Sequence, residues 1–202
     1  YSGLEVTVTG TDDNVLMQKS TSSEIVLNAG SIITLSPMSA TPIGWNIVGS
    51  FTNNWQSWID LSGGHGIYYC TNITVPADEG SFKIRKGASQ WYGQTGAVEV
   101  LKPVKANENG SGDFTIASGT YDFYFVEDNT NVIVTEAGTA AFSVIGNINN
   151  TPYNTDFPMV IENGWLVAKG IEFTGNTFKI RTTGKWNEDS SYNIGVGSKD
   201  ET

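Results

Sequence analysis

The feature that most constrains the fold of this chain is an internal repeat with a period of about 97 residues. Four motifs recur in the same order: 45–49 with 142–146, 66–69 with 164–167, 81–85 with 177–181, and Trp91 with Trp186. The third pair is the clearest, since Ser-Phe-Lys-Ile-Arg becomes Thr-Phe-Lys-Ile-Arg. Self-similarity at a fixed period indicates two copies of one structural module.

Short runs with alternating apolar and polar residues predict strands throughout the chain. They are rich in Val, Ile, Thr and aromatic residues, which suit half-buried pleated strands, and Gly, Asn and Pro punctuate them. The expected strands are Leu4–Thr9, Ile25–Leu27, Ile32–Leu35, Trp45–Val48, Ile67–Val75, Phe82–Lys86, Val98–Val104, Asp113–Ile116, Tyr121–Val126 and Val132–Thr135. This spacing predicts an all-β protein of tandem immunoglobulin-like β-sandwich modules.

The repeat also predicts the domain boundaries. Residues 41–140 form one complete module, and residues 141–202 match only its first half. Three runs between residues 14 and 35 resemble the strands predicted between residues 113 and 135. Because a half-sandwich would expose strand edges and an apolar face, we expect residues 1–39 to complete the second module. This assembly would occur within one chain or between neighbouring molecules by strand exchange.

Charge and composition exclude several functions. A formal net charge of -10 argues against binding nucleic acid, which needs a basic face. Cys70 is the only cysteine and His65 the only histidine, so neither a disulfide within the chain nor a Ser/His/Asp set is expected. We interpret Cys70 as a core residue. The cysteine and histidine ligands that a zinc site needs are missing, and no metal or other cofactor is expected.

Three motifs resemble the C-terminal modules of the SusE/SusF family of bacterial starch-binding proteins. They are Gly44–Phe51 followed by Asn54-Trp55, Phe82–Arg85 followed by Trp91, and Gly119–Phe123. The resemblance covers 41–140 fully and 141–202 more loosely. It implies an outer-membrane lipoprotein on the cell surface that binds starch or a related α-glucan without cutting it. Other outer-membrane glycan-uptake proteins would be its partners.

The resemblance also implies a sugar site of two aromatic residues, a Lys or Arg, and an Asn or Asp. Aromatic rings would cover the apolar face of a pyranose, and polar side chains would bind its hydroxyls. In the first module Trp45 and Trp91 would be the two platforms, Lys83 the donor and Asp113 the acceptor. Arg85 would help or replace Lys83, and the platform would be extended by Trp55, Trp58 and Tyr92. The alternative for each is structural: a core aromatic, a solvated strand lysine, or a turn aspartate.

A second, weaker site is expected from Trp186, Lys179 and Asn14, because Phe142 stands where the first copy has Trp45. Catalysis is not expected, since the acidic residues are scattered through loops and a glycosidase needs two carboxyls held across one bond. The alternatives to sugar binding are a structural spacer of tandem modules and a protein-interaction module, which would show an exposed apolar edge or patch.

Overall fold

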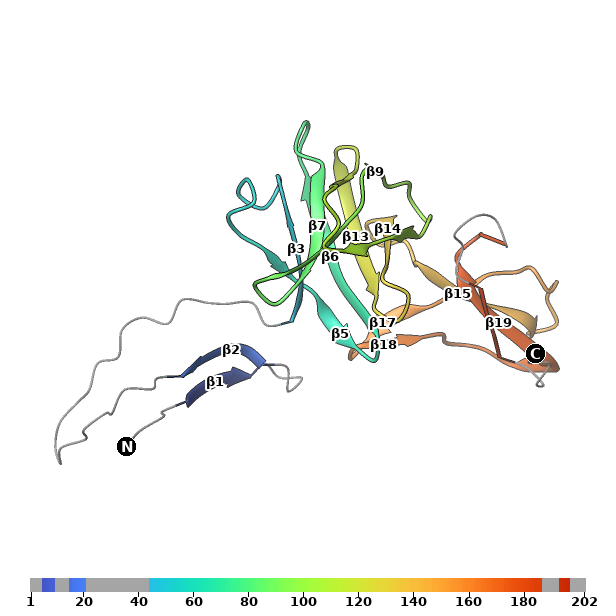
Figure 1. The fold of residues 1–202 in the computed structure, drawn as a ribbon. Coiled ribbons are helices and arrows are strands. Elements are labelled where there is room, and N and C mark those ends of the chain that lie inside the picture. The colour runs from blue at the N-terminus through green and yellow to red at the C-terminus, as the bar shows by residue number, and fades with distance from the viewer. Residues whose placement is uncertain (1–4, 10–14, 21–43, 187–192, 197–202) are drawn as a thin grey trace, which may run out of the picture.

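A computed structural model describes residues 5–9, 15–20, 44–186 and 193–196. Within these ranges every regular element is a β-strand, and nearly all pairs are antiparallel (Figure 1). The prediction of an all-β fold is therefore confirmed. The described part of the chain contains no helix with the length and apolarity needed to cross a membrane.

Residues 45–136 form a sandwich of two sheets. One sheet contains β3 (Trp45–Gly49), β4 (Ile59–Asp60), β7 (Ser81–Lys86), β8 (Gln90–Gly93), β9 (Gly96–Ala97), β11 (Asn107–Glu108) and β12 (Phe114–Thr115). The other contains β5 (Ser62–Gly64), β6 (Ile67–Val75), β10 (Val104–Lys105), β13 (Gly119–Val126) and β14 (Asn131–Glu136). Large aromatic side chains from both sheets fill the space between them, chiefly Phe82, Phe114, Phe123 and Phe125. Burial of such side chains contributes about 1.5–3 kcal/mol each.

The second copy repeats the strand pairing of the first. In the first, β3 pairs with β7 so that Ile47 lies opposite Ile84. In the second, β15 (Phe142–Ile148) pairs with β19 (Phe173–Thr182) so that Val144 lies opposite Ile180. The remaining strands of that sheet are β16 (Phe157–Pro158) and β20 (Asn193–Val196). The repeated sequence thus specifies the same register twice.

Two hairpins with the same kind of turn also correspond in the two copies. The β5–β6 hairpin turns at His65-Gly66, and the hairpin of β17 (Val160–Glu162) with β18 (Trp165–Val167) turns at Asn163-Gly164. All four turn residues have φ between 50° and 83°. Two consecutive left-handed residues match the right-handed twist of the flanking strands. The two hairpins also meet, since the His65 and Trp165 rings stack with their centroids 4.0 Å apart.

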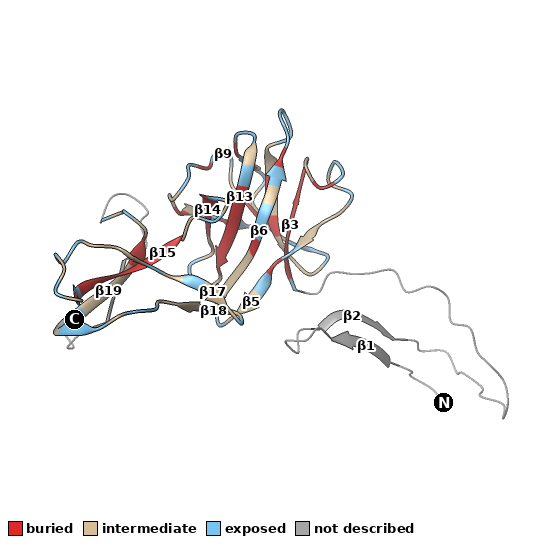
Figure 2. Cartoon of the chain, turned by 180° about the vertical axis from the view of Figure 1, so that it is seen from behind, coloured by how far each residue is buried: buried red, intermediate tan, exposed pale blue. Residues whose placement is uncertain are grey.

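The outer face of the β13–β14 hairpin joins the two copies. Phe123 and Phe125 point into the sandwich, so Tyr124 and Val126 point to its outer side. There, together with Ile133, they pack against the second copy through Ala141, Phe142, Met159, Ile161, Leu166 and Ile180. Figure 2 shows the result, with β13, β14 and β15 largely buried. The junction is therefore an apolar core of its own.

One predicted strand is wrong, and two others lie outside the described residues. The strand expected over Val98–Val104 is wrong: Leu101 has a φ of 60°, and regular pairing exists only in the flanking β9 and β10. Pro103 lacks the N–H that a central strand would use. At the N-terminus, β1 (Glu5–Thr9) pairs with β2 (Val15–Ser20), while the strands expected at Ile25–Leu27 and Ile32–Leu35 lie outside the described residues.

Candidate functional site

Strand β7 places the predicted polar residues on the outer face of the sandwich. Phe82 and Ile84 are buried in the core, so the alternating positions Lys83 and Arg85 point away from it. Opposite Arg85 on the neighbouring strand β8 is Trp91. Trp91 is therefore a residue of strand β8.

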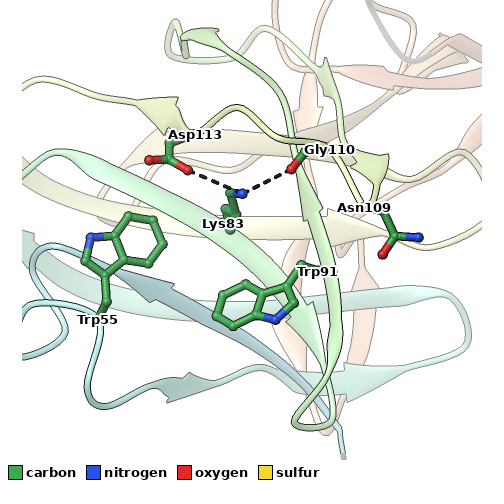
Figure 3. A pocket seen from close by; sticks show the side chains of 6 residues that line it. All are labelled: Trp55, Lys83, Trp91, Asn109, Gly110 and Asp113. Atoms are coloured by element: carbon green, nitrogen blue, oxygen red, sulfur yellow. Dashed lines mark hydrogen bonds and ion pairs between the residues drawn. The ribbon is translucent and has the colours of Figure 1, made fainter.

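An open pocket of about 520 Å³ lies on this face (Figure 3). Its lining residues are Trp55, Lys83, Trp91, Asn109, Gly110 and Asp113. The Lys83 ammonium donates to the carbonyl of Gly110 at 3.0 Å and lies 3.5 Å from a carboxylate oxygen of Asp113. The Lys83 side chain is only 16% exposed, whereas that of Asp113 is 43% exposed. The pocket thus combines two indoles with a held cation and an accessible carboxylate.

Trp55 reaches the pocket from a tight turn after β3. Three consecutive residues, Asn53, Asn54 and Trp55, have φ between 49° and 69°. The turn is held by hydrogen bonds from the Trp55 N–H to the Gly49 carbonyl at 2.9 Å and from the Asn54 N–H to the Ser50 carbonyl at 3.0 Å. A left-handed conformation is unfavourable for a bulky residue, and such strain is concentrated at functional sites.

The backbone approaches closely beside the pocket, at Gly93 on β8. A Cβ added to Gly93 would lie 2.4 Å from the Gly112 carbonyl and 3.1 Å from the Lys83 side chain. The loop after β11 can therefore lie directly against β8, with the Asn109 N–H donating to the Trp91 carbonyl at 2.7 Å. This contact sets Gly110 and Asp113 within reach of Lys83.

Arg85 lies beside the pocket and is not among its lining residues. Its guanidinium carbon is 5.0 Å from the ring centroid of Trp91 and 5.6 Å from that of Trp58. Its Nε donates to Asn46 at 2.8 Å. Burial lowers the pKa of the guanidinium, and the charge of Asp60 opposes this shift. Since arginine starts from so high a pKa, Arg85 remains charged at neutral pH.

The structure corrects the expectation that Trp45 and Tyr92 present their rings to a ligand. Trp45 is 3% exposed, and both residues belong to the core of the first sandwich. Trp45 packs against Phe125 and Tyr92, with ring centroids 4.3 and 5.1 Å apart. The indole that lines the pocket with Trp91 is therefore Trp55.

The second expected site is described only in part, since Asn14 lies outside the described residues. Lys179 and Arg181 alternate on β19 as Lys83 and Arg85 do on β7. The guanidinium of Arg181 lies 4.5 Å from the ring centroid of Trp186. Trp186 in turn lies nearly parallel to Tyr153, at 13° and 6.4 Å between centroids. A cation beside an indole therefore recurs in both copies.

Cys70 is buried, as the sequence indicated. Burial, and next the charge of Asp122, raise the pKa of its thiol to about 12. The thiol therefore stays protonated at neutral pH, and its position on β6 facing the core makes it a packing residue.

Sequence reasoning missed Asn109 and Gly110 in the pocket lining. The available signal was the Asn-Gly dipeptide, which is typical of a turn. That signal predicts a change of chain direction but not which strand the turn will approach, so it did not identify these residues as lining.

When the chain is compared with protein-family models, curated proteins and solved structures, none of them matches it.

Proposed function

We propose that this chain is a non-catalytic carbohydrate-binding protein, and that the pocket between Trp55 and Trp91 holds a segment of an α-glucan such as starch. One observation carries the proposal: two partly exposed indoles line the same pocket as a lysine and an aspartate. Indoles suit the apolar C–H faces of pyranose rings, and the charged pair suits the hydroxyls between them.

The polar groups supply complementary hydrogen bonds. The Lys83 ammonium has three donors, of which Gly110 and Asp113 use two at most. Asp113 accepts, and its exposure leaves an oxygen accessible to a hydroxyl. Adjacent sugar hydroxyls both donate and accept, so a neighbouring donor and acceptor match them better than either group alone.

Capture without cleavage fits the composition of the pocket. Asp113 is the single carboxylate among its lining residues, and that carboxylate is paired with Lys83. Hydrolysis of a glycosidic bond ordinarily uses two carboxyl groups, about 5–10 Å apart. The pocket supports holding a glycan more than cutting one.

Calorimetric titration with maltoheptaose, cello-oligosaccharides and xylo-oligosaccharides tests the proposal. We expect binding of maltoheptaose, weakened about fivefold to tenfold by Trp55→Ala and by Trp91→Ala, since each stacked ring contributes about 1 kcal/mol. Lys102→Ala is a control outside the pocket lining, because Lys102 is an exposed lysine paired with Glu99. If the protein binds none of the three sugars, the proposal is wrong.

A structural spacer is the second candidate, and the apolar junction between the two copies favours it. A spacer needs a stiff junction and no ligand, whereas a binding protein shows saturable affinity. The same titrations therefore separate the two candidates. Rigid spacing and binding are also compatible, because a fixed arrangement of modules would raise retention on a long polysaccharide.

The resemblance to SusE/SusF modules suggests where the protein acts. We propose that it belongs to an outer-membrane lipoprotein on the cell surface, working beside other glycan-uptake proteins. Protease treatment of intact cells producing the full-length protein tests this location. Surface exposure predicts digestion without lysis, and protection until lysis would contradict it.

A further inference from the structure

We propose that Arg85 is a positioning residue, which fixes the indole of Trp91 for the ligand and does not bind the ligand itself. This inference rests on the proposed function of the pocket. It revises the expectation that Arg85 assists or replaces Lys83 as a donor to sugar hydroxyls.

The first support is that the guanidinium lies close to two indoles. It lies 5.0 Å from the Trp91 centroid and 5.6 Å from the Trp58 centroid, within the range of a cation–π interaction. Only Trp91 of these three residues lines the pocket. Arg85 therefore contacts the platform from beside the pocket, where it restrains the ring without occupying ligand space.

The second support is that Arg85 is itself held. Asn46, which is fully buried, lies opposite Arg85 in the β3–β7 ladder and accepts its Nε–H at 2.8 Å. The Asn46 amide nitrogen donates in turn to the carbonyls of Gly44 and Gly87, at 3.3 and 3.4 Å. With Nε bonded to Asn46 and Nη2 buried, the planar guanidinium has little freedom to turn towards a sugar.

The third support is that the second copy keeps the arrangement but changes the anchor. Arg181 again lies beside an indole, that of Trp186. The residue opposite Arg181 in the ladder is Ser143, whose hydroxyl shares a hydrogen bond with the hydroxyl of Thr183. Asp156 supplies the anchor instead, accepting from Arg181 Nε at 2.9 Å. Two different anchors for one Arg–Trp contact indicate that the contact is what both copies need.

The test compares Arg85→Met with Lys86→Met. Lys86 also lies over an indole, 4.9 Å from the centroid of Trp45, but that indole is in the core. We expect Arg85→Met to weaken maltoheptaose binding about fivefold to tenfold, and Lys86→Met to leave it unchanged. Arg85→Gln, which can still donate to Asn46, serves as a second variant if Arg85→Met folds poorly, and it should also weaken binding.

A double-mutant cycle separates positioning from direct contact. Affinity electrophoresis through amylose measures the weak binding of Trp91→Ala. If Arg85 acts through Trp91, adding Arg85→Met to Trp91→Ala causes no further loss. An equal loss in both backgrounds would mean that Arg85 contacts the glycan, and it would overturn the proposal, as would full affinity in Arg85→Met.

A ligand-free measurement keeps this inference distinct from the proposed function. With fluorotryptophan incorporated, Arg85→Met should shift or broaden the ¹⁹F resonances of Trp91 and Trp58, and the resonance of Trp55 should not change. If the wild-type protein binds no glycan, the proposed function fails and this spectrum still tests the Arg85–Trp91 contact. An unchanged Trp91 resonance would overturn that contact.

Discussion

The indole of Trp45 lies 4.3 Å from the ring of Phe125, between centroids, across the interior of the first sandwich. Trp45 is on β3 and Phe125 on β13, so this contact joins the two sheets. We predict that Trp45→Ala lowers the free energy of unfolding by about 3–5 kcal/mol, as large-to-small core changes do. Denaturant unfolding followed by circular dichroism measures this loss.

Trp45→Phe is the informative partner variant, because Phe142 is found at the corresponding position of the second copy. It should cost less stability than Trp45→Ala and should leave glycan affinity unchanged. A marked loss of affinity in a stably folded Trp45→Phe protein would contradict the assignment of Trp45 to the core.

The left-handed backbone at Trp55 predicts that two variants of this residue differ in stability but not in ligand affinity. Since Trp55 has a φ of 69°, Trp55→Gly should be more stable than Trp55→Ala by about 1 kcal/mol, because glycine adopts this conformation without strain. Both variants lose the indole and should lose affinity equally. Thermal unfolding and titration of this matched pair test the prediction, and equal stability of the two would show that the turn is not strained.

How far the sequence predicted the site depends on burial. Alternation placed Lys83 and Arg85 on one strand face. Trp91, Trp55 and Asp113 were predicted for the sugar site, and all three line one pocket. The choice of Trp45 over Trp55 failed because alternation gives opposite faces but not which face is covered. On β3 this ambiguity is complete, since all five of its residues are buried.

The same limit explains the junction between the two copies. Tyr124 and Ile133 alternate with core residues and would ordinarily face solvent, yet they pack against the second copy. A repeat reveals that two modules exist, but the surface on which they meet is a tertiary property. Likewise, the left-handed turn that carries Trp55 towards the pocket has no clear signal in Asn53-Asn54 beyond their tolerance of positive φ.

The Lys86–Glu127 pair predicts a pH dependence of stability. The pKa of Glu127 is lowered, first because Lys86 donates to it at 2.8 Å and also by the charge of Lys86. The pair should therefore contribute fully above the ordinary glutamate value of 4.5, and this contribution should vanish as pH falls through the lower folded pKa. Because both side chains are partly exposed, it is expected to be below about 1 kcal/mol.

Glu127→Gln isolates this effect. The difference in unfolding free energy between wild type and Glu127→Gln should be present at pH 7 and shrink towards pH 3. Glu99→Gln is the control, since Glu99 pairs with Lys102 at the surface. A difference that grows on acidification would contradict the sign assigned to Glu127.

One side of β18 has no partner strand within the part of the chain that the structure describes. In the first copy β6 pairs with β5 on one side and with β13 on the other. Among the described residues its counterpart β18 pairs with β17 alone, and Trp165 on β18 is 56% exposed. Residues 23–27 lie outside the described residues and resemble residues 121–125 of β13, so the sequence-based prediction that residues 1–39 complete the second copy would put them beside β18. Hydrogen exchange should then protect the amides of both segments.

Removal of residues 1–39 tests whether these residues complete the second copy. If these residues cover the second copy, their removal should increase binding of an apolar dye and lower the stability of 141–202. Adding back a peptide of residues 1–39 should reverse both effects. Sedimentation of the intact chain distinguishes the two routes, since pairing within one chain gives monomers and strand exchange gives larger species. Fast exchange at Ile25 and Leu166 in the intact chain would contradict the predicted pairing of these two segments.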